Sequence, residues 1–312
     1  MAKKIKIVVL GSLLYDCVTY GPRLPRMGET IIGNKNGFFF GGKGANQAVQ
    51  AARMGAEVYF IGRVGEDETG EKLIWNLDKN GINTDHVIKD KKVPTGTCCI
   101  HVDDRGDNAI MIAPLANLEI STQDIDKTIS LMDNCDIFLT QLEVNIEATV
   151  YAIKKAHKAG LPIVLNPAPA IEIPEEIFPL IDFITPNETE TEFFTGIMPA
   201  ADNLDSCRKA ADALLEKGVK NVLITLGKKG VYFKNSREEQ LIPTFEDIKA
   251  VDTTAAGDAF NAAFTVTLAE GTAVPRALMY GNAAGSAAAS QAGSQPSLAM
   301  RETIEKIMTS QA

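Results

Sequence analysis

The sequence has few residues of the kinds that build disulfide frameworks or zinc sites. It contains five cysteines, an odd number without a C-x-x-C spacing, and three histidines, none of them four residues from another. Disulfide scaffolds use even sets of cysteines, and zinc sites commonly use ligands paired at helical spacing. We therefore expect reduced thiols in a cytoplasmic protein and no zinc centre.

Basic clusters and long apolar segments are also scarce. The 312 residues include 31 Lys and Arg against 40 Asp and Glu, a formal charge of −9. Nucleic acids and anionic membrane surfaces bind clusters of basic side chains, so we expect neither as a partner. No apolar run reaches the roughly 20 residues of a membrane span, and the short run 5–10 predicts a first strand rather than a signal peptide. If an anion binds, backbone amides and a metal must supply most of the positive charge.

Two familiar phosphate-binding motifs are missing as well. A dinucleotide fingerprint would place G-x-G-x-x-G after the first strand, but residues 11–16 read GSLLYD. A Walker loop would end in Gly-Lys followed by Ser or Thr, but here Glu71 separates Gly70 from Lys72. The sequence therefore matches neither motif.

What the chain does contain is an alternation of short apolar runs with longer segments of helical period. Expected strands lie at 5–10, 58–61, 137–140, 163–165, 183–185 and 222–226, and expected helices at 45–54, 67–80, 146–159 and 204–217. This order predicts an α/β fold, doubly wound around a central, mostly parallel sheet, with a mostly helical part from Gly257 onward. We expect a single domain over 1–312, although the length alone also admits two.

Two stretches break this alternation. Residues 30–40, and residues 96–102 with 109–113 around the polar turn 103–108, have the character of inserted antiparallel strands. We expect them to form a small β-sheet lid from about 14–40 and 96–113. A sheet of this size cannot bury its own apolar face, so it should pack on the main domain, a ligand or a second copy of the chain.

The segment 252–258, DTTAAGD, precedes a helical stretch at 259–270. Small residues at a helix entry leave unpaired amides with the helix dipole behind them, which favours an anion. Asp258 would lie in the first turn, where a carboxylate can take a proton from a hydroxyl beside those amides. The structural alternative is a helix capped by Thr253 or Thr254, with Asp258 only complementing the dipole.

The segment 40–47, FGGKGANQ, is rich in glycine. Three glycines in four residues let the backbone approach a ligand closely, and Asn46 can both donate to and accept from a hydroxyl. The alternative is a flexible hinge before a helix. The binding loop and the hinge are compatible interpretations if the lid closes over a bound ligand.

These two segments, with six others, resemble the PfkB or ribokinase-like family of carbohydrate kinases. The other matching segments are 11–16, 141–143, 166–169, 186–190, 225–230 and 295–297. The resemblance implies a ribokinase-like sandwich with a β lid. It also implies an enzyme that uses ATP and Mg²⁺ to phosphorylate the 5-hydroxyl of a free pentose, D-ribose or 2-deoxy-D-ribose. A monovalent cation, usually potassium, and a homodimer formed through the lid are further implications.

The resemblance implies a role for each group of matching residues. Asp258 would be the catalytic base, with the amides of Ala255, Ala256 and Gly257 as the anion hole. Sugar contacts are implied for Leu14, Asp16, Gly42, Lys43, Gly44, Ala45, Asn46, Glu143 and Asp258. Nucleotide contacts are implied for Asn187, Glu190 (which also organises Mg²⁺ indirectly), Thr225, Leu226, Gly227, Lys228, Lys229, Gly230, Gly257 and Asn282. The monovalent cation is implied at Asp252, Thr254, Ala288, Gln291, Gly293 and Ser297.

Leu14 departs from the family pattern, which typically has Asn two residues before the first sugar-binding Asp. On a strand, Leu14 and Asp16 share a face. Leu cannot pair with a sugar hydroxyl, whereas a deoxy carbon would pack against it, as in the deoxyribokinase branch that this position resembles. We expect both pentoses to be accepted, with 2-deoxyribose relatively better than in an Asn-bearing member. The alternative is that Leu14 only packs beneath the lid.

Two other functions remain open from the sequence. A kinase for another sugar or for a nucleoside would carry the same motifs, with walls for a base in the nucleoside case. A sugar- or nucleotide-sensing protein could keep the fold without turnover. Asp258, Glu190 and the glycine-rich anion site argue against a sensor, because binding alone needs no base.

Overall fold

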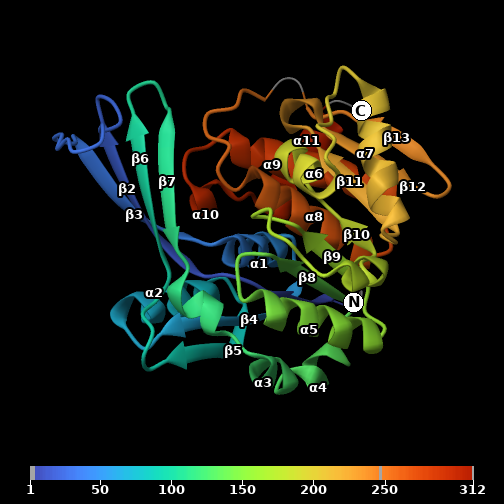
Figure 1. Cartoon of the computed structure of the whole chain (residues 1–312), viewed down its shortest axis with the longest axis horizontal. Coiled ribbons are helices and arrows are strands. Elements are labelled where there is room, and N and C mark those ends of the chain that lie inside the picture. Colours follow the sequence, from blue (N-terminus) through green and yellow to red (C-terminus); the bar gives the residue numbers. More distant parts are fainter. Residues whose placement is uncertain (1–3, 246–247, 311–312) are drawn as a thin grey trace.

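The computed structural model describes residues 4–245 and 248–310, and a predicted span of 1–312 therefore includes a few residues outside it. A nine-stranded sheet forms the centre, and a separate four-stranded sheet projects from one end (Figure 1). The central strands, in spatial order, are β13 (Glu239–Ile242), β12 (Val231–Asn235), β11 (Asn221–Thr225), β10 (Phe183–Ile184), β9 (Ile163–Asn166), β8 (Ile137–Gln141), β1 (Lys6–Leu10), β4 (Glu57–Gly65) and β5 (Asn83–Asp90).

The central sheet is parallel from β5 to β11, and only the β11–β12–β13 edge is antiparallel. Because parallel neighbours need crossover connections, helices cover both faces, and the strands between them are buried on both sides. The prediction of a doubly wound, mostly parallel sheet is confirmed. β5, β12 and β13, which lie at or next to the two edges of the sheet, were not predicted, since they are less continuously apolar than β8 or β9.

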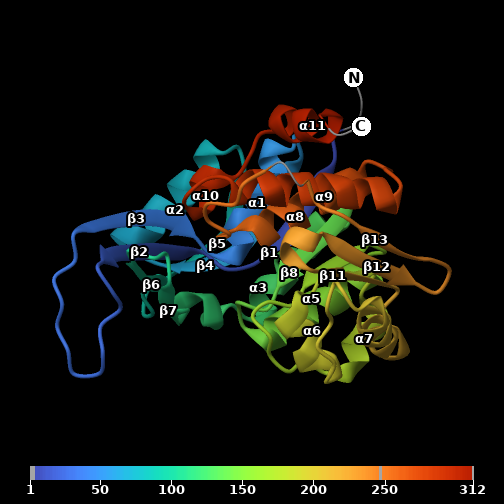
Figure 2. The same cartoon turned by 90° about the horizontal axis from the view of Figure 1, so that it is seen from above.

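Figure 2 shows the two helical layers on either side of the sheet. One layer holds α1 (Lys43–Arg53), α2 (Glu68–Lys79), α8 (Ala256–Ala269), α9 (Val274–Ala289) and α11 (Arg301–Thr309). The other holds α3 (Thr122–Asp126), α4 (Ile129–Met132), α5 (Ile146–Lys158), α6 (Glu188–Thr195) and α7 (Leu204–Glu216). Each layer packs on its own buried apolar core, the first including Phe60 and Phe264 and the second Phe138 and Phe178.

Local signals explain where the helices begin and end. In α5, the side chain of Asn145 accepts a hydrogen bond from the Ala148 amide at 3.0 Å, and Gly160 has a φ of 77° just after the last turn. Such caps satisfy the backbone groups that a helix leaves open at its ends. The four predicted helices agree with α1, α2, α5 and α7 to within two residues. Among the described helices, none combines the length and apolar character that a bilayer crossing requires.

The small sheet has the strand order β3 (Lys35–Gly41), β2 (Leu14–Gly21), β6 (Thr97–Asp103) and β7 (Asn108–Ala113). Two expectations for this lid are wrong. Residues 30–34 are not in a strand, and the lid is not wholly antiparallel: β2–β3 and β6–β7 are antiparallel pairs, but β2–β6 is parallel. The pairing is parallel because β2 and β6 both run outward from the main body, each returning through its own hairpin partner. The short α10 (Ser294–Ser297) lies beside β3.

Candidate active site

A cavity of about 200 Å³ lies where the parallel strands β9, β10 and β11 end, next to the N-terminus of α8. In open α/β sheets, ligands bind at this carboxyl edge of the strands. Seven residues singled out from the sequence line the cavity: Lys43, Asn187, Glu190, Thr225, Ala255, Gly257 and Asp258. Five further residues complete the wall: Asn166, Ala168, Thr185, Thr253 and Asn261.

The N-terminus of α8 presents free backbone amides to this cavity. Ala255 adopts a left-handed conformation with a φ of 60°, and no side chain caps the helix. Within the described chain, the N–H groups of Ala255, Gly257 and Asp258 have no acceptor. The Ala256 amide, which was also expected to be free, donates to the Thr253 carbonyl at 3.2 Å. The alternative of a helix capped by threonine is therefore wrong, and the hydroxyl of Thr254 donates instead to Asp252 at 2.6 Å. Free amides with the helix dipole behind them suit an anion.

Asp258 lies in the first turn of α8 and is buried. Its Oδ2 accepts from Asn46 Nδ2 at 2.9 Å, and its Oδ1 accepts from Gln47 Nε2 at 3.0 Å. Burial raises the pKa of Asp258, although Lys43 and the two amide donors act in the opposite direction. A carboxyl whose pKa is moved toward neutral pH is suited to take up a proton during catalysis.

A second group of polar residues lies beside Asp258, toward the lid. Glu143 Oε2 accepts from the hydroxyl of Ser12 and, at 3.0 Å, from the amide of Lys43. Burial, with a contribution from Glu143, raises the pKa of Asp16 to about 7 against the effect of Lys43. The buried Oδ1 of Asn46 finds no hydrogen-bond partner anywhere in residues 4–245 or 248–310. The unpaired oxygen of Asn46 beside the buried carboxyl groups of Asp16 and Glu143 fits a neutral ligand rich in hydroxyl groups.

Leu14 and Asp16 do share a face of β2, and both are buried. Leu14 pairs with Gly41 of β3 and Asp16 with Phe39. The absence of a side chain at Gly41 makes room for the Asp16 carboxylate, because a Cβ there would lie 2.2 Å from its Oδ2. Leu14 lies against Gly96 in the same way, with its Cδ2 2.8 Å from where a Cβ would be. Apolar packing and a polar acceptor are therefore side by side on one strand.

Asn187 and Glu190 form the N-terminal capping box of α6. Asn187 Oδ1 accepts from the Glu190 amide at 2.8 Å, and Glu190 Oε2 accepts from the Asn187 amide at 2.9 Å. Burial raises the pKa of Glu190, against the lowering effect of the Asn187 amide and Lys43. Both residues reach the cavity wall while they hold the helix start.

The turn after β11 contains the other residues matched to a nucleotide. Gly227 and Gly230 have φ values of 51° and 99°, and the Leu226 amide donates to the Gly230 carbonyl at 2.8 Å. Lys228 and Lys229 are exposed, whereas Leu226 is buried in the core. Asn282 lies on α9, and its Nδ2 donates to the carbonyls of Ile242 and Pro243, each at 3.0 Å. A nucleotide contact by Asn282 stays a prediction.

The residues matched to a monovalent cation are only partly brought together by hydrogen bonds. Asp252 accepts from the Thr254 amide and hydroxyl and, at 2.9 Å, from the Gly293 amide. Although burial acts against the charge, these hydrogen bonds lower the pKa of Asp252. Two of the other residues make local hydrogen bonds: the backbone amide of Gln291 donates to the Ala288 carbonyl, and the hydroxyl of Ser297 donates to the Ser294 carbonyl.

Sequence reasoning missed a set of buried amides behind Asp258. Gln47 Nε2 donates to Asn166 Oδ1 at 3.1 Å as well as to Asp258, and Gln141 Nε2 donates to Gln47 Oε1 at 2.6 Å. A signal was present, since a glutamine on the buried face of an otherwise apolar helix needs a polar partner. The partners themselves lie 94 or more residues away in the chain and could not be identified from it.

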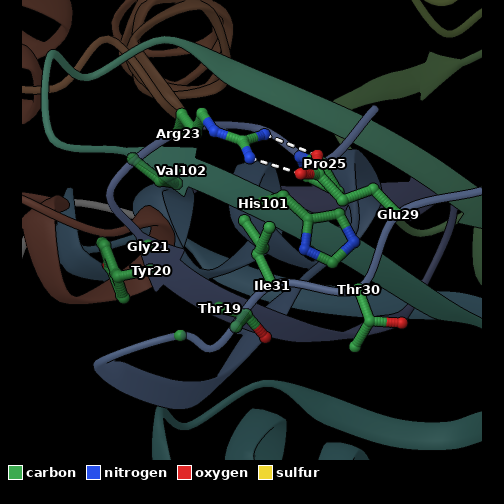
Figure 3. Close-up of a pocket in the computed structure, with 11 residues that line it drawn as sticks. Thr19, Tyr20, Gly21, Arg23, Pro25, Glu29, Thr30, Ile31, His101 and Val102 are labelled. Carbon is green, nitrogen blue, oxygen red and sulfur yellow. Dashed lines mark hydrogen bonds and ion pairs between the residues drawn. The ribbon is translucent and has the colours of Figure 1, made fainter. Parts of the chain in front are cut away.

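A second hollow of about 230 Å³ lies at the outer end of the lid (Figure 3). His101 lines it, and Arg23 Nη1 donates to Glu29 Oε2 at 2.6 Å across it. Because these two charges satisfy each other, we place the candidate active site at the cavity of Asp258, where Lys43, Glu190 and Asp258 meet.

Comparisons with known proteins agree with this geometry. Residues 4–300 match the model of the pfkB family of carbohydrate kinases. The chain is 39% identical to a ribokinase of Haemophilus influenzae over 300 residues, covering 96% of this chain and 97% of that protein. It is also 39% identical to a deoxyribokinase of Salmonella typhi over 259 residues, 83% of this chain and 84% of that one. The structure of Arabidopsis thaliana ribokinase complexed with ribose and ATP superposes with a TM-score of 0.90 at 32% identity, covering 98% and 99% of the two chains.

Proposed function

The chain belongs to the pfkB family of carbohydrate kinases, and from this premise we propose that it transfers the γ-phosphoryl group of ATP to the 5-hydroxyl of a free pentose. The observation that carries the proposal is the position of Asp258. Its carboxylate lies within 3.0 Å of amides on α1 and in the same helical turn as three free backbone N–H groups. A base and an anion hole therefore face one cavity.

In the proposed reaction, Asp258 takes the proton of the 5-hydroxyl. The oxygen then forms a bond to the γ-phosphorus while the bond to the bridging oxygen breaks, and ADP leaves with that electron pair. The free amides of Ala255, Gly257 and Asp258 stabilise the negative charge on the transferred phosphoryl group. The proton on Asp258 afterwards passes to solvent.

The pentose is proposed to lie between the lid and α1. Asp16 and Glu143 would accept hydrogen bonds from sugar hydroxyl groups, and the unpartnered Oδ1 of Asn46 would accept another. A ligand with several hydroxyl groups would satisfy acceptors that the chain alone leaves open. Lys43 offsets the charge of these acids, because the carboxylates of Asp258, Glu143 and Glu190 raise its pKa in spite of its burial.

ATP is proposed to lie over the turn 225–230, with its phosphates directed toward α8. In the described residues, no three His, Cys, Asp or Glu side chains converge to form a metal cage. This fits Mg²⁺, which is usually held by phosphate oxygens, water and one or two carboxylates, with Glu190 as the indirect protein partner. When bound, Mg²⁺ neutralises part of the triphosphate charge, which a protein of charge −9 cannot do with surface lysines.

Three finer features complete the proposal. The loop of Asp252 would hold a monovalent cation, supported by a carboxylate whose hydrogen bonds keep it ionised. Exposed apolar residues on the lid would pair two copies of the chain. The enzyme would work in the cytoplasm, in line with its unpaired cysteines.

A kinase assay that couples ADP release to a colour change tests the function. We expect turnover with ribose and 2-deoxyribose, and little with fructose 6-phosphate or adenosine. Asp258→Asn should fold and bind sugar but lose at least about 100-fold in kcat, because a positioned base contributes about 10²- to 10⁴-fold. Wild-type turnover in this variant would remove Asp258 from the mechanism, and adenosine as the best substrate would instead identify a nucleoside kinase.

A further inference from the structure

We propose that Gln47, itself oriented by Gln141, is a positioning residue that holds the Asp258 carboxylate in its reactive orientation. The proposal rests on the function proposed above. Gln47 is fully buried on the inner side of α1, behind the carboxylate as seen from the cavity, and it does not line the cavity itself. It can therefore act on the reaction only through the residues that it contacts in the cavity wall, Asp258 and Asn166, and of these two Asp258 is the proposed base.

The hydrogen bonds permit only one orientation of the Gln47 amide. An ionised carboxylate only accepts, so the nitrogen of Gln47 must face Asp258 Oδ1, which lies 3.0 Å away. The same nitrogen donates to Asn166 Oδ1 at 3.1 Å, at the end of β9. Gln141 at the end of β8 donates to Gln47 Oε1 at 2.6 Å, which prevents the amide from turning over.

Gln141 is itself confined rather than fully paired. Its Oε1 is buried and has no hydrogen-bond partner in the described chain. It lies against Gly11, where an added Cβ would be only 2.3 Å away. The chain thus keeps a costly unpaired oxygen in its interior while the opposite end of the same amide orients Gln47. Buried polar atoms without partners are rare in native proteins; the Oε1 of Gln50, the control residue below, is another in this chain, so the hydrogen bond from Gln141 to Gln47 carries the inference.

The network also affects the charge of Asp258. Lys43 from α1, Glu143 after β8 and Glu190 from α6 are the charged groups that interact with this carboxylate. Hydrogen bonds from Asn46 and Gln47 lower its pKa against the larger effect of burial. Asn46 reaches the sugar-binding region and its contacts will change with substrate, whereas Gln47 remains buried. Gln47 therefore supplies the hydrogen bond that stays constant through the catalytic cycle.

The test measures kcat at saturating ribose and ATP across pH 5.5 to 9 for Gln47→Leu and Gln50→Leu. Gln50 is a matched control, because it is a fully buried glutamine on the same helix whose Nε2 donates to the Ala299 carbonyl, away from the cavity. We expect Gln47→Leu to lose about 10- to 100-fold in kcat with KM changed little, as for other residues that orient a reactive group. The acid limb of its kcat profile should move up by about one pH unit, because it loses one hydrogen bond to a charged group.

Gln50→Leu should leave the acid limb in place. Gln141→Leu should shift it in the same direction as Gln47→Leu but by less, and should add nothing in the Gln47→Leu background, because it acts through Gln47. If Gln47→Leu does not fold, as judged by its thermal unfolding, Gln47→Met and the Gln141→Leu variant carry the same test.

Two results would overturn the inference: an unmoved acid limb in a folded Gln47 variant, or an equal shift in Gln50→Leu. Wild type without turnover on any pentose would instead reject the proposed function. The two failures are therefore distinguishable.

Discussion

Asp16 and Asp258 are both buried acids, but their surroundings differ. Asp258 receives two side-chain hydrogen bonds, whereas Asp16 accepts none from residues 4–245 or 248–310. Only the charge of Lys43 opposes the effect of burial at Asp16. In the proposed complex, sugar hydroxyls would supply the missing donors.

The pH dependence of stability should reflect this difference. Burial raises the pKa of Asp16 from 3.8 to about 7, so between these values the folded chain binds more protons than the unfolded chain. The contribution of Asp16 to the free energy of unfolding therefore falls as pH rises through this window. We expect Asp16→Asn to match wild type near pH 4 and to be more stable by about 4 kcal/mol at pH 8, measured by urea unfolding without ligand. A constant difference from pH 4 to 8 would contradict the raised pKa.

Leu14 provides the second prediction for a single residue. We expect Leu14→Asn to shift the ratio of kcat/KM for ribose over 2-deoxyribose by about 10-fold or more toward ribose, because an amide can pair with a hydroxyl that leucine cannot satisfy. Leu14→Met keeps an apolar side chain of similar volume and should keep the wild-type ratio. No relative shift in Leu14→Asn would mean that Leu14 only packs against Gly96.

Among the elements, the N-terminus of α8 and the lid strands build the site together. α8 begins with Ala255 in a left-handed conformation and without a side-chain cap, which leaves its amides for a ligand. β2 carries Asp16, and β3 leads through Gly42 directly into α1, which carries Asn46 and Gln47. Movement of the lid strands would therefore alter the sugar contacts and the surroundings of the base at the same time.

The turn between β11 and β12 gives a prediction at this scale. A Cβ on Gly230 would lie 2.1 Å from the Ile242 carbonyl oxygen, whereas a Cβ on Gly227 would meet nothing within 4 Å. Both have positive φ values, so Gly227→Ala should cost about 1 kcal/mol for the backbone alone. Gly230→Ala should cost about 3 kcal/mol because it also overpacks the turn, and should raise KM for ATP. Equal losses in urea unfolding would show that the contact with β13 is not restrictive.

At the scale of the whole molecule, the lid projects away from the two apolar cores of the central domain. On the face of the lid that bears Asp16, the register β2–β6–β7 aligns Val18 with Ile100 and Ile110, and Cys98 with Ile112. Ile110 is 56% exposed and Ile112 is 41% exposed. An apolar stripe of this kind on a projecting sheet suits a second copy of the chain.

Sedimentation measurements test this pairing with two adjacent residues. Ile110→Lys places a charge on the Asp16 face and should convert a dimer into monomers at micromolar concentration. Met111 is 76% exposed on the opposite face of the same strand, and the Met111→Lys variant should remain dimeric. A monomeric wild type, or dissociation of both variants, would reject pairing through this face.

Local sequence was sufficient for the helices α1, α2, α5 and α7 and for the buried strands β1, β8, β9 and β11, whereas the roles of the candidate site residues came from the family resemblance. Asn145 and Gly160 delimit α5 through interactions within a few residues, and DTTAAGD indicates an uncapped anion site through its own small side chains. Tertiary structure alone decided that Asp258 meets Asn46, 212 residues away, and that Gln141 supports Gln47. It likewise decided that β2 pairs parallel with β6. The physical reason is that helix caps and periodicity depend on neighbours in the chain, whereas these pairings exist only once crossover connections bring distant strands together around two packed cores.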